Sequence, residues 1–314
     1  MRIEVYQHER HRAQWEEFVS KRARNAHFMH RRCYLDYHAD RFDDHSLLFF
    51  GERAAPLAVL PANRVGEMLV SHGGLSFGGL LVGSRFRLSQ WREAFAAIGD
   101  HMAGAGLETL DYRPPPPWYH QQPGEEDVFL LESAGLQPVL LGSAICRIGG
   151  RFPGNPTRRN ESRGTGLDVA REDAALGETL ELVAETLRLR HEAAPVHTRA
   201  EIEHLAGLFP DGIRCYTVRR DAELVAGAIV FVTAPVVKLQ YVGYTIGRAM
   251  SVVYAHLFSL EELRGRWIDF GTSMAGGGGV LDAGLFAYKE SLGGQLAPVR
   301  RYKITRECPL LIPC

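Results

Sequence analysis

Apolar and polar positions recur along this chain with two periods, and together they predict a mixed α/β protein. In the first half, apolar residues at helical spacing predict helices over 12–23 and 88–104. Short apolar runs bounded by turn residues predict strands over 46–50, 57–60 and 107–112. Strands followed by a helix and a further strand are typical of a mixed α/β unit.

The second half repeats this order of elements. Helical periodicity predicts helices over 176–192 and 249–263. Apolar runs predict a hairpin and two further strands, over 214–219, 224–232, 236–244 and 266–270. The repeated order suggests an internal structural duplication, although the residues of the two halves do not align.

Two turn-rich stretches interrupt the pattern. Four consecutive prolines within 113–124 exclude a helix or a central strand there. The second stretch, 149–160, is rich in glycine and proline and leads into a polar segment. A length of 314 residues suits two domains, which we therefore expect at 1–150 and 165–314.

Composition narrows the classes of function. A net charge of −1 provides no overall basic field, so we expect no DNA partner and only local contacts with polyanions. The five cysteines are scattered without metal-ligand spacing, which indicates reduced thiols. The first residues lack the apolar core of a signal peptide, and no run approaches the roughly 18 apolar residues of a membrane span. We expect a cytoplasmic protein without a membrane span.

The C-terminal motifs carry the strongest functional signal. A short apolar strand ends in Asp269-Phe-Gly271, a glycine run follows at 276–279, and a predicted helix then carries Lys289 and stops at Gly293-Gly294. Other motifs occur in a fixed order before them, namely Ser71-His-Gly-Gly, Arg190-His191, Pro195-Val-His197 and Gln240-Tyr241. In this joint order the chain resembles the Fem-like (FemABX-type) aminoacyltransferase branch of the GNAT acyltransferase superfamily.

That resemblance implies a duplicated GNAT-like fold whose two domains share a cleft. It also implies an enzyme that transfers an aminoacyl group from aminoacyl-tRNA to a small amine, with no metal or other cofactor. The acceptor would be a peptide, a nucleotide-linked molecule or a natural product. An ordinary CoA-dependent GNAT carries an (Arg/Gln)-x-x-Gly-x-(Gly/Ala) loop, whereas residues 244–249 keep only one glycine. This departure favours the tRNA donor over acyl-CoA.

Two alternatives stay open on the same scaffold. The first is an acyl-CoA-dependent N-acyltransferase acting on an amino sugar or another small amine. The second is a non-catalytic binding protein, because a fold does not fix an activity. The sequence does not indicate the oligomeric state.

The resemblance implies two catalytic residues. The amino group of Lys289 would stabilise the oxyanion that forms when an amine attacks the acyl carbonyl, or would hold a donor phosphate. Asp269 would accept a proton from the attacking amine or orient it. The alternatives are a solvated surface lysine and an aspartate that hydrogen-bonds backbone amides in a turn.

Further residues are candidates for binding. The glycine-rich loop at Ser71 would contact the acceptor, and the two histidines near 191–197 would shape the substrate site rather than act as bases or metal ligands. The proposed substrate-binding residues are Ser71, His72, Tyr119, Arg190, His191, His197, Tyr241 and Ser273. Arg158 and Arg159, in a local basic cluster, are candidates for phosphate or donor binding, with a solvated linker as the alternative.

Overall fold

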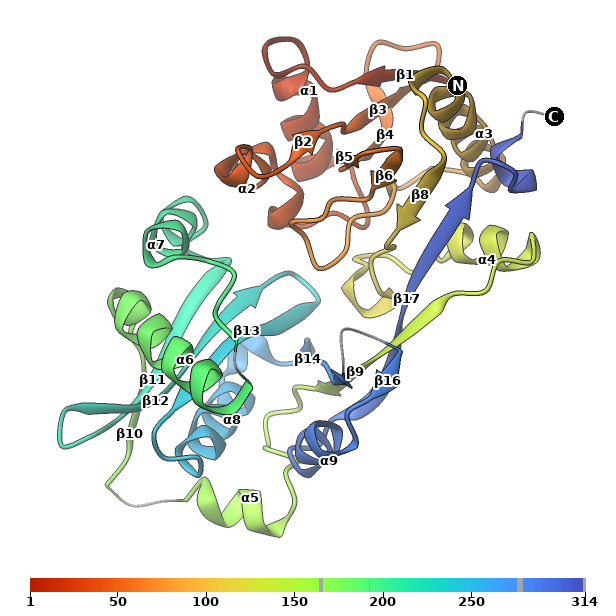
Figure 1. Ribbon diagram of the computed structural model, residues 1–314. Coiled ribbons are helices and arrows are strands. Elements are labelled where there is room, and N and C mark those ends of the chain that lie inside the picture. The colour runs from red at the N-terminus through yellow and green to blue at the C-terminus, as the bar shows by residue number, and fades with distance from the viewer. Residues whose placement is uncertain (164–165, 192, 276–278, 313–314) are drawn as a thin grey trace. The chain divides into compact units, whose positions relative to one another are not determined.

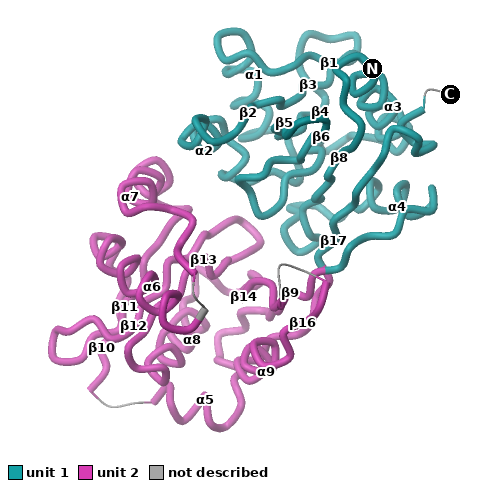
Figure 2. Tube along the Cα trace, viewed as in Figure 1, with its two compact units in different colours: residues 1–140, 299–314 teal, residues 141–298 magenta. Residues whose placement is uncertain are grey.

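The computed structural model describes residues 1–163, 166–191, 193–275 and 279–312 (Figure 1). The chain divides into two compact units (Figure 2). Unit 1 comprises residues 1–140 and 299–314, and unit 2 comprises residues 141–298. Both units are mixed α/β structures, as the sequence pattern predicts.

Unit 1 contains two groups of paired strands. The first is antiparallel, in the order β1 (Arg2–Val5), β3 (Leu47–Phe50), β4 (Pro56–Leu60) and β7 (Leu81–Val82). The second has the order β17 (Gln295–Thr305), β8 (Thr109–Tyr112), β6 (Met68–Val70), β5 (Asn63–Val65) and β2 (Asp43–Asp44). The helices are α1 (His8–Lys21), α2 (Arg32–Leu35), α3 (Leu88–Ala105) and α4 (Glu126–Ser133).

The long helix α3 shows why this part of the chain folds as it does. Its apolar residues recur every three or four positions and are buried along one face, at Trp91, Phe95, Ile98 and Met102. The helix ends at Gly106, which has a φ of 66° and adopts the left-handed conformation that glycine favours. The buried face of α3 forms part of the core of unit 1.

Unit 2 contains one six-stranded arrangement. Its order is β10 (Asp168–Arg171), β11 (Ile213–Arg220), β12 (Glu223–Val232), β13 (Val236–Tyr244), β14 (Trp267–Thr272) and β9 (Val139–Arg147). Two short strands, β15 (Met274–Ala275) and β16 (Val280–Leu281), pair antiparallel with each other. The helices are α5 (Pro156–Glu161), α6 (Leu176–His191), α7 (Arg199–Leu208), α8 (Ala249–Ser259) and α9 (Ala283–Ser291).

The two halves of the chain share an order of elements but exchange their last strands. Each half contains a first strand, helices, antiparallel strands, a helix, and a strand that pairs in parallel, β8 with β6 and β14 with β13. The strand after α4 is β9, which pairs with β14 in unit 2. The strand after α9 is β17, which pairs with β8 in unit 1.

This exchange moves the boundaries away from the division expected at 150 and 165. Residues 141–150 belong to unit 2 because β9 is hydrogen-bonded to β14. Residues 299–314 belong to unit 1 because β17 pairs with β8 and buries Tyr302 and Ile304 in its core. Residue 165 itself lies outside the described residues.

No helix within the described ranges is both long and apolar enough to span a bilayer. The longest helix of unit 1, α3, has a polar face as well as a buried one. Within the same ranges, no three His, Cys, Asp or Glu side chains gather in a way that could hold a metal ion.

Candidate acyl-transfer site in unit 2

The strands β13 and β14 separate at one pair of residues. Their parallel pairing covers Val236 to Lys238 on β13 and Trp267 to Asp269 on β14. Beyond that pair, β13 continues along β12, and β14 continues along β9 after an irregularity between Asp269 and Thr272. Backbone groups past the pair therefore lack partners from the neighbouring strand and need other ones.

Lys289 supplies donors to two of these backbone groups. Its ammonium nitrogen lies 2.8 Å from the carbonyl oxygens of both Gly271 and Thr272. The side chain is 7% exposed, so Lys289 is not a solvated surface lysine. Burial lowers the pKa of Lys289 to about 8, against the opposing attraction of Asp269 and Asp282. The amino group therefore titrates near neutral pH.

The helix that carries Lys289 is fixed at both ends. Asp282 caps its start by accepting a hydrogen bond from the Leu285 amide at 2.9 Å. Its end is followed by Gly293, which has a φ of 97°. Close packing of Gly293 against Pro153 leaves no room for a Cβ atom. The Gly293-Gly294 stop is thus a packing requirement that fixes the position of Lys289.

Asp269 is buried and already serves as an acceptor. Its Oδ1 atom accepts hydrogen bonds from the Ser143 hydroxyl and from the Gly271 amide, both at 2.8 Å. The second bond is the turn-type contact considered as the structural alternative for this residue. The first bond joins residues far apart in the sequence and fixes the orientation of the carboxylate. Asp269 also attracts the ammonium group of Lys289.

A second lysine completes this group, and the sequence analysis missed it. Lys238 donates to Gln240 Oε1 at 2.6 Å, and Gln240 lies in the bulge of β13 opposite Ile229 and Val230. Burial lowers the pKa of Lys238, and attraction to Asp269 opposes the shift. One signal was available in the sequence, because Lys238 is one of only four lysines and follows two valines in an apolar strand. Ser143 gave no such signal.

Two other predicted residues pair within unit 2. The Nδ1 atom of His197 lies 2.6 Å from the Tyr241 hydroxyl, and both side chains are buried.

The other predicted binding residues of unit 2 lie outside this pair. Ser273 follows β14 and is fully buried, and its hydroxyl has no hydrogen-bond partner among the described residues. Arg190 is exposed on α6, with its guanidinium 4.8 Å from the Tyr244 ring centroid. His191 ends α6, and its side chain lies outside the described residues.

Three backbone amides at the start of α8 are hydrogen-bonded within the preceding turn. The amides of Ala249, Met250 and Ser251 donate to the carbonyls of residues 246–248 within the same turn. A diphosphate held at a helix start needs amides that point outward without a partner. These three amides are instead engaged within the turn itself.

The basic candidates Arg158 and Arg159 lie on α5 and have partners inside unit 2. Arg158 donates from Nε to the Ser291 hydroxyl and from Nη1 to Glu161, both at 2.9 Å. Arg159 donates to the Gly154 carbonyl at 2.8 Å. These bonds fix α5 and occupy much of the donor capacity that a phosphate would use.

The candidates in unit 1 also have structural partners. The Ser71 hydroxyl accepts a bond from the Arg113 amide at 2.8 Å. His72 has a φ of 50° and accepts a bond from the Gly74 amide at Nδ1, and burial lowers its pKa to about 3. Tyr119 is buried against Phe77, with ring centroids 4.5 Å apart. These contacts stabilise the glycine-rich loop that begins at Ser71, and they are made within the protein rather than to a ligand.

Comparisons with known proteins bear on the reaction class and on the fold. Residues 155–288 match the family model described as acetyltransferase (GNAT) domain. This part of the chain is similar to GNAT domains. It contains Lys238 and Asp269, and it ends one residue before Lys289. A search of curated proteins gives no significant sequence match.

Solved structures share the fold of nearly the whole chain. FemX matches with a TM-score of 0.64 at 10% identity, over 97% of both chains. A conserved protein of unknown function from Bacteroides thetaiotaomicron matches with a TM-score of 0.61 at 13% identity, over 96% of this chain and 98% of that one. The C-terminal domain (DUF2156) attributed to a lysylphosphatidylglycerol synthetase of Agrobacterium fabrum gives 0.57 at 13% identity, over 95% and 92%. These matches confirm the Fem-like fold predicted from the sequence.

Proposed function

We propose that this GNAT-type acyltransferase forms an amide by moving an aminoacyl group from a charged tRNA to the amine of a small acceptor. The acceptor would be a peptide, a nucleotide-linked molecule or a natural product. The GNAT match over 155–288 and the FemX-like fold support the reaction class. A tRNA donor also implies a cytoplasmic reaction.

The observation that carries the proposal is the group of Lys238, Asp269 and Lys289, in which Asp269 and Lys289 are buried and Lys238 is half-buried. When both amines are protonated, the two lysines and the Asp269 carboxylate carry a net positive charge, and Asp282 at the start of α9 also attracts Lys289. Attack of an amine on an acyl carbonyl places negative charge on the carbonyl oxygen. A fixed positive charge in a buried site stabilises that oxyanion more strongly than water does.

The roles of the individual residues follow from their bonds. Two of the three ammonium hydrogens of Lys289 are used by Gly271 and Thr272, which leaves one for the oxyanion. Asp269 holds the ammonium in place by attraction, and Ser143 fixes the carboxylate. As the amide bond forms, the ester bond to the tRNA breaks. The proton of the attacking amine passes to Asp269 or, within the substrate itself, to the departing tRNA oxygen.

The acyl donor that we propose is aminoacyl-tRNA rather than acyl-CoA. The occupied amides at the start of α8 favour a tRNA donor because they offer little to a diphosphate. A second candidate is an acyl-CoA-dependent N-acyltransferase on an amino sugar or a similar amine. The description of the matching family as acetyltransferase favours that candidate. The proposals differ in the donor and share the catalytic group.

The test is transfer from a mixed pool of radiolabelled aminoacyl-tRNAs to a panel of amines, with acetyl-CoA in parallel. Amide formation that ribonuclease abolishes would support the tRNA donor, whereas product from acetyl-CoA alone would assign the second candidate. Lys289→Met should lose the activity. Lys303→Met is the matched control, because Lys303 is an exposed lysine of unit 1. No transfer from any donor would refute both candidates.

A further inference from the structure

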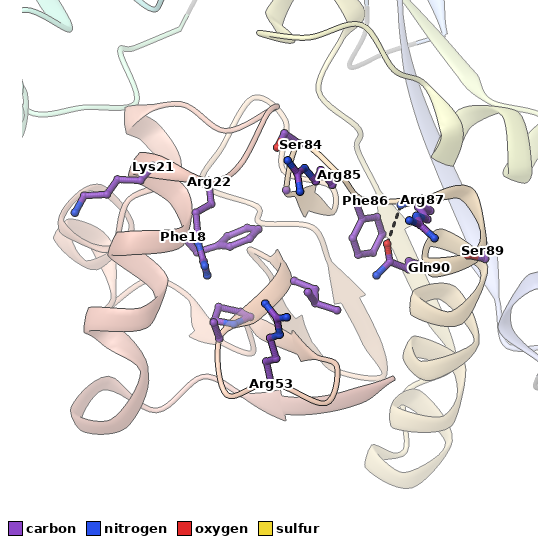
Figure 3. A pocket seen from close by; sticks show the side chains of 14 residues that line it. Phe18, Lys21, Arg22, Arg53, Ser84, Arg85, Phe86, Arg87, Ser89 and Gln90 are labelled. Carbon is purple, nitrogen blue, oxygen red and sulfur yellow. Dashed lines mark hydrogen bonds between the residues drawn. The ribbon is translucent and has the colours of Figure 1, made fainter.

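A basic pocket of about 780 Å³ lies within unit 1 (Figure 3). Three segments form it, namely the end of α1, residues 53–57 at the start of β4, and the segment 83–90 that leads into α3. Its volume falls in the range of about 300–1,000 Å³ that is usual for small-molecule sites. No candidate residue of the acyl-transfer reaction lines this pocket.

The charges around the pocket are all of one sign. The cationic side chains that line it are Lys21, Arg22, Arg53, Arg85 and Arg87, and no aspartate or glutamate lines it. None of the five forms an ion pair with a described residue. Nearby arginines of the same unit behave differently, since Arg24 pairs with Glu126 and Arg32 pairs with Asp36 and Asp44. Two acids, Glu52 and Glu93, line a separate hollow of about 540 Å³ that shares Arg53 with the pocket.

The rest of the lining is suited to a ligand with both a charged and an apolar part. Ser84, Ser89 and Gln90 add polar groups at the start of α3, where the partial positive charge of the helix also favours an anion. Phe18 and Phe86 are buried and, with Pro56, provide apolar surface. Figure 3 shows that the cationic side chains belong to separate segments of the chain.

We propose that this pocket binds the pyrophosphate group of a nucleotide-sized ligand. Five unpaired cations around one pocket repel each other, and an anion relieves that repulsion. Their combined charge exceeds that of a single phosphate and suits a diphosphate better. Arginine is the residue type best suited to phosphate because its planar donors bind two oxygens at once. The inference does not depend on the proposed acyl transfer.

The test is calorimetric titration of the full chain with inorganic pyrophosphate and, separately, with orthophosphate. We expect pyrophosphate to bind more tightly than orthophosphate, and its binding to weaken as salt increases. The double variant Arg22→Gln/Arg85→Gln should weaken pyrophosphate binding by about tenfold or more, because charged hydrogen bonds are lost. Arg92→Gln is the matched control, because Arg92 is an exposed arginine of α3 that does not line the pocket.

A second variant and a second ligand sharpen the test. Ser84→Glu places a carboxylate in the pocket and should abolish pyrophosphate binding without removing any arginine. ADP distinguishes the source of the group, since tighter binding than pyrophosphate indicates a nucleoside-linked ligand and equal binding indicates the diphosphate alone. The proposal is overturned if pyrophosphate does not bind, or if Arg92→Gln weakens binding as much as the double variant does.

Discussion

Lys238 and Asp269 are the last paired residues of the parallel ladder between β13 and β14. Beyond the end of this ladder, the ammonium group of Lys289 donates hydrogen bonds to the carbonyl oxygens of Gly271 and Thr272. The lysine thus has a structural task as well as the catalytic one that we propose. The catalytic role of Lys289 should appear in the reaction rate, and its structural role should appear in the stability of the fold.

The first prediction concerns the dependence of rate on pH. Because the pKa of Lys289 is about 8, the rate should fall as pH rises through that value and the ammonium group is lost. In Lys289→Arg this fall should disappear, since arginine stays charged. Lys289→Met should lower kcat by about a hundredfold or more at every pH. The role is refuted if Lys289→Arg keeps the same fall in rate.

The second prediction concerns stability. The folded-state pKa of Lys289 is about 8 and its ordinary value is 10.5, so the unfolded chain binds more protons between these values. The free energy of unfolding should therefore rise with pH across this window, by about 3 kcal/mol for this group. Lys289→Met should lack that rise. Urea unfolding of both proteins across the window measures the difference, and parallel curves would contradict the prediction.

A third prediction compares two glycines of α3. A Cβ atom at Gly99 would lie 1.8 Å from the Leu311 carbonyl oxygen, whereas one at Gly104 would meet nothing within 4 Å. Gly99→Ala should displace the C-terminal turn and cost about 1–3 kcal/mol. Gly104→Ala should stabilise the protein by about 0.5–1 kcal/mol, because alanine favours the helix. Equal midpoints for the two variants in thermal unfolding would refute this.

A fourth prediction concerns a buried carboxyl. Asp127 accepts a bond from the Tyr112 hydroxyl at 2.7 Å, and that hydroxyl accepts one from the Leu80 amide. Tyr112→Phe leaves both buried groups without this partner and should cost about 1–3 kcal/mol. The control is Tyr302→Phe, whose partner Glu132 is exposed and can bond to water instead. Denaturant unfolding compares them, and an equal loss would contradict the argument.

The local pattern of the sequence predicted most elements closely. The helix over 88–104 and the strand over 236–244 occur as α3 and β13 within a residue. The helix expected over 249–263 ends earlier, at Ser259, where the chain turns into a short 3-10 helix. These elements follow from apolar periodicity, which is a local property.

Two features could not be read from the sequence because they depend on distant pairings. The bond between Ser143 and Asp269 joins residues 126 positions apart, and no local motif marks Ser143. The exchange of β9 and β17 likewise depends on which distant strand each one meets. Lys289 was found through its motif, whereas Lys238 became a site residue only once β13 lay beside β14.

The fifth prediction tests the exchange of strands. A chain ending at residue 298 lacks the part of β17 that pairs with β8 and the buried Tyr302 and Ile304. Unit 1 should then be cleaved readily in limited proteolysis, whereas unit 2 should stay protected. A synthetic peptide of residues 295–312 should restore protection. Full protection of unit 1 in the shortened chain would show that β17 is dispensable.

The same exchange has a consequence for the protein as it leaves the ribosome. Unit 2 has all its strands once residue 298 has emerged, but unit 1, whose synthesis begins first, needs residues 299–314. Until then β8 has an open edge that can pair with another nascent chain. The half of the molecule that is made first is therefore completed last, and it is the half most exposed to misassembly during translation.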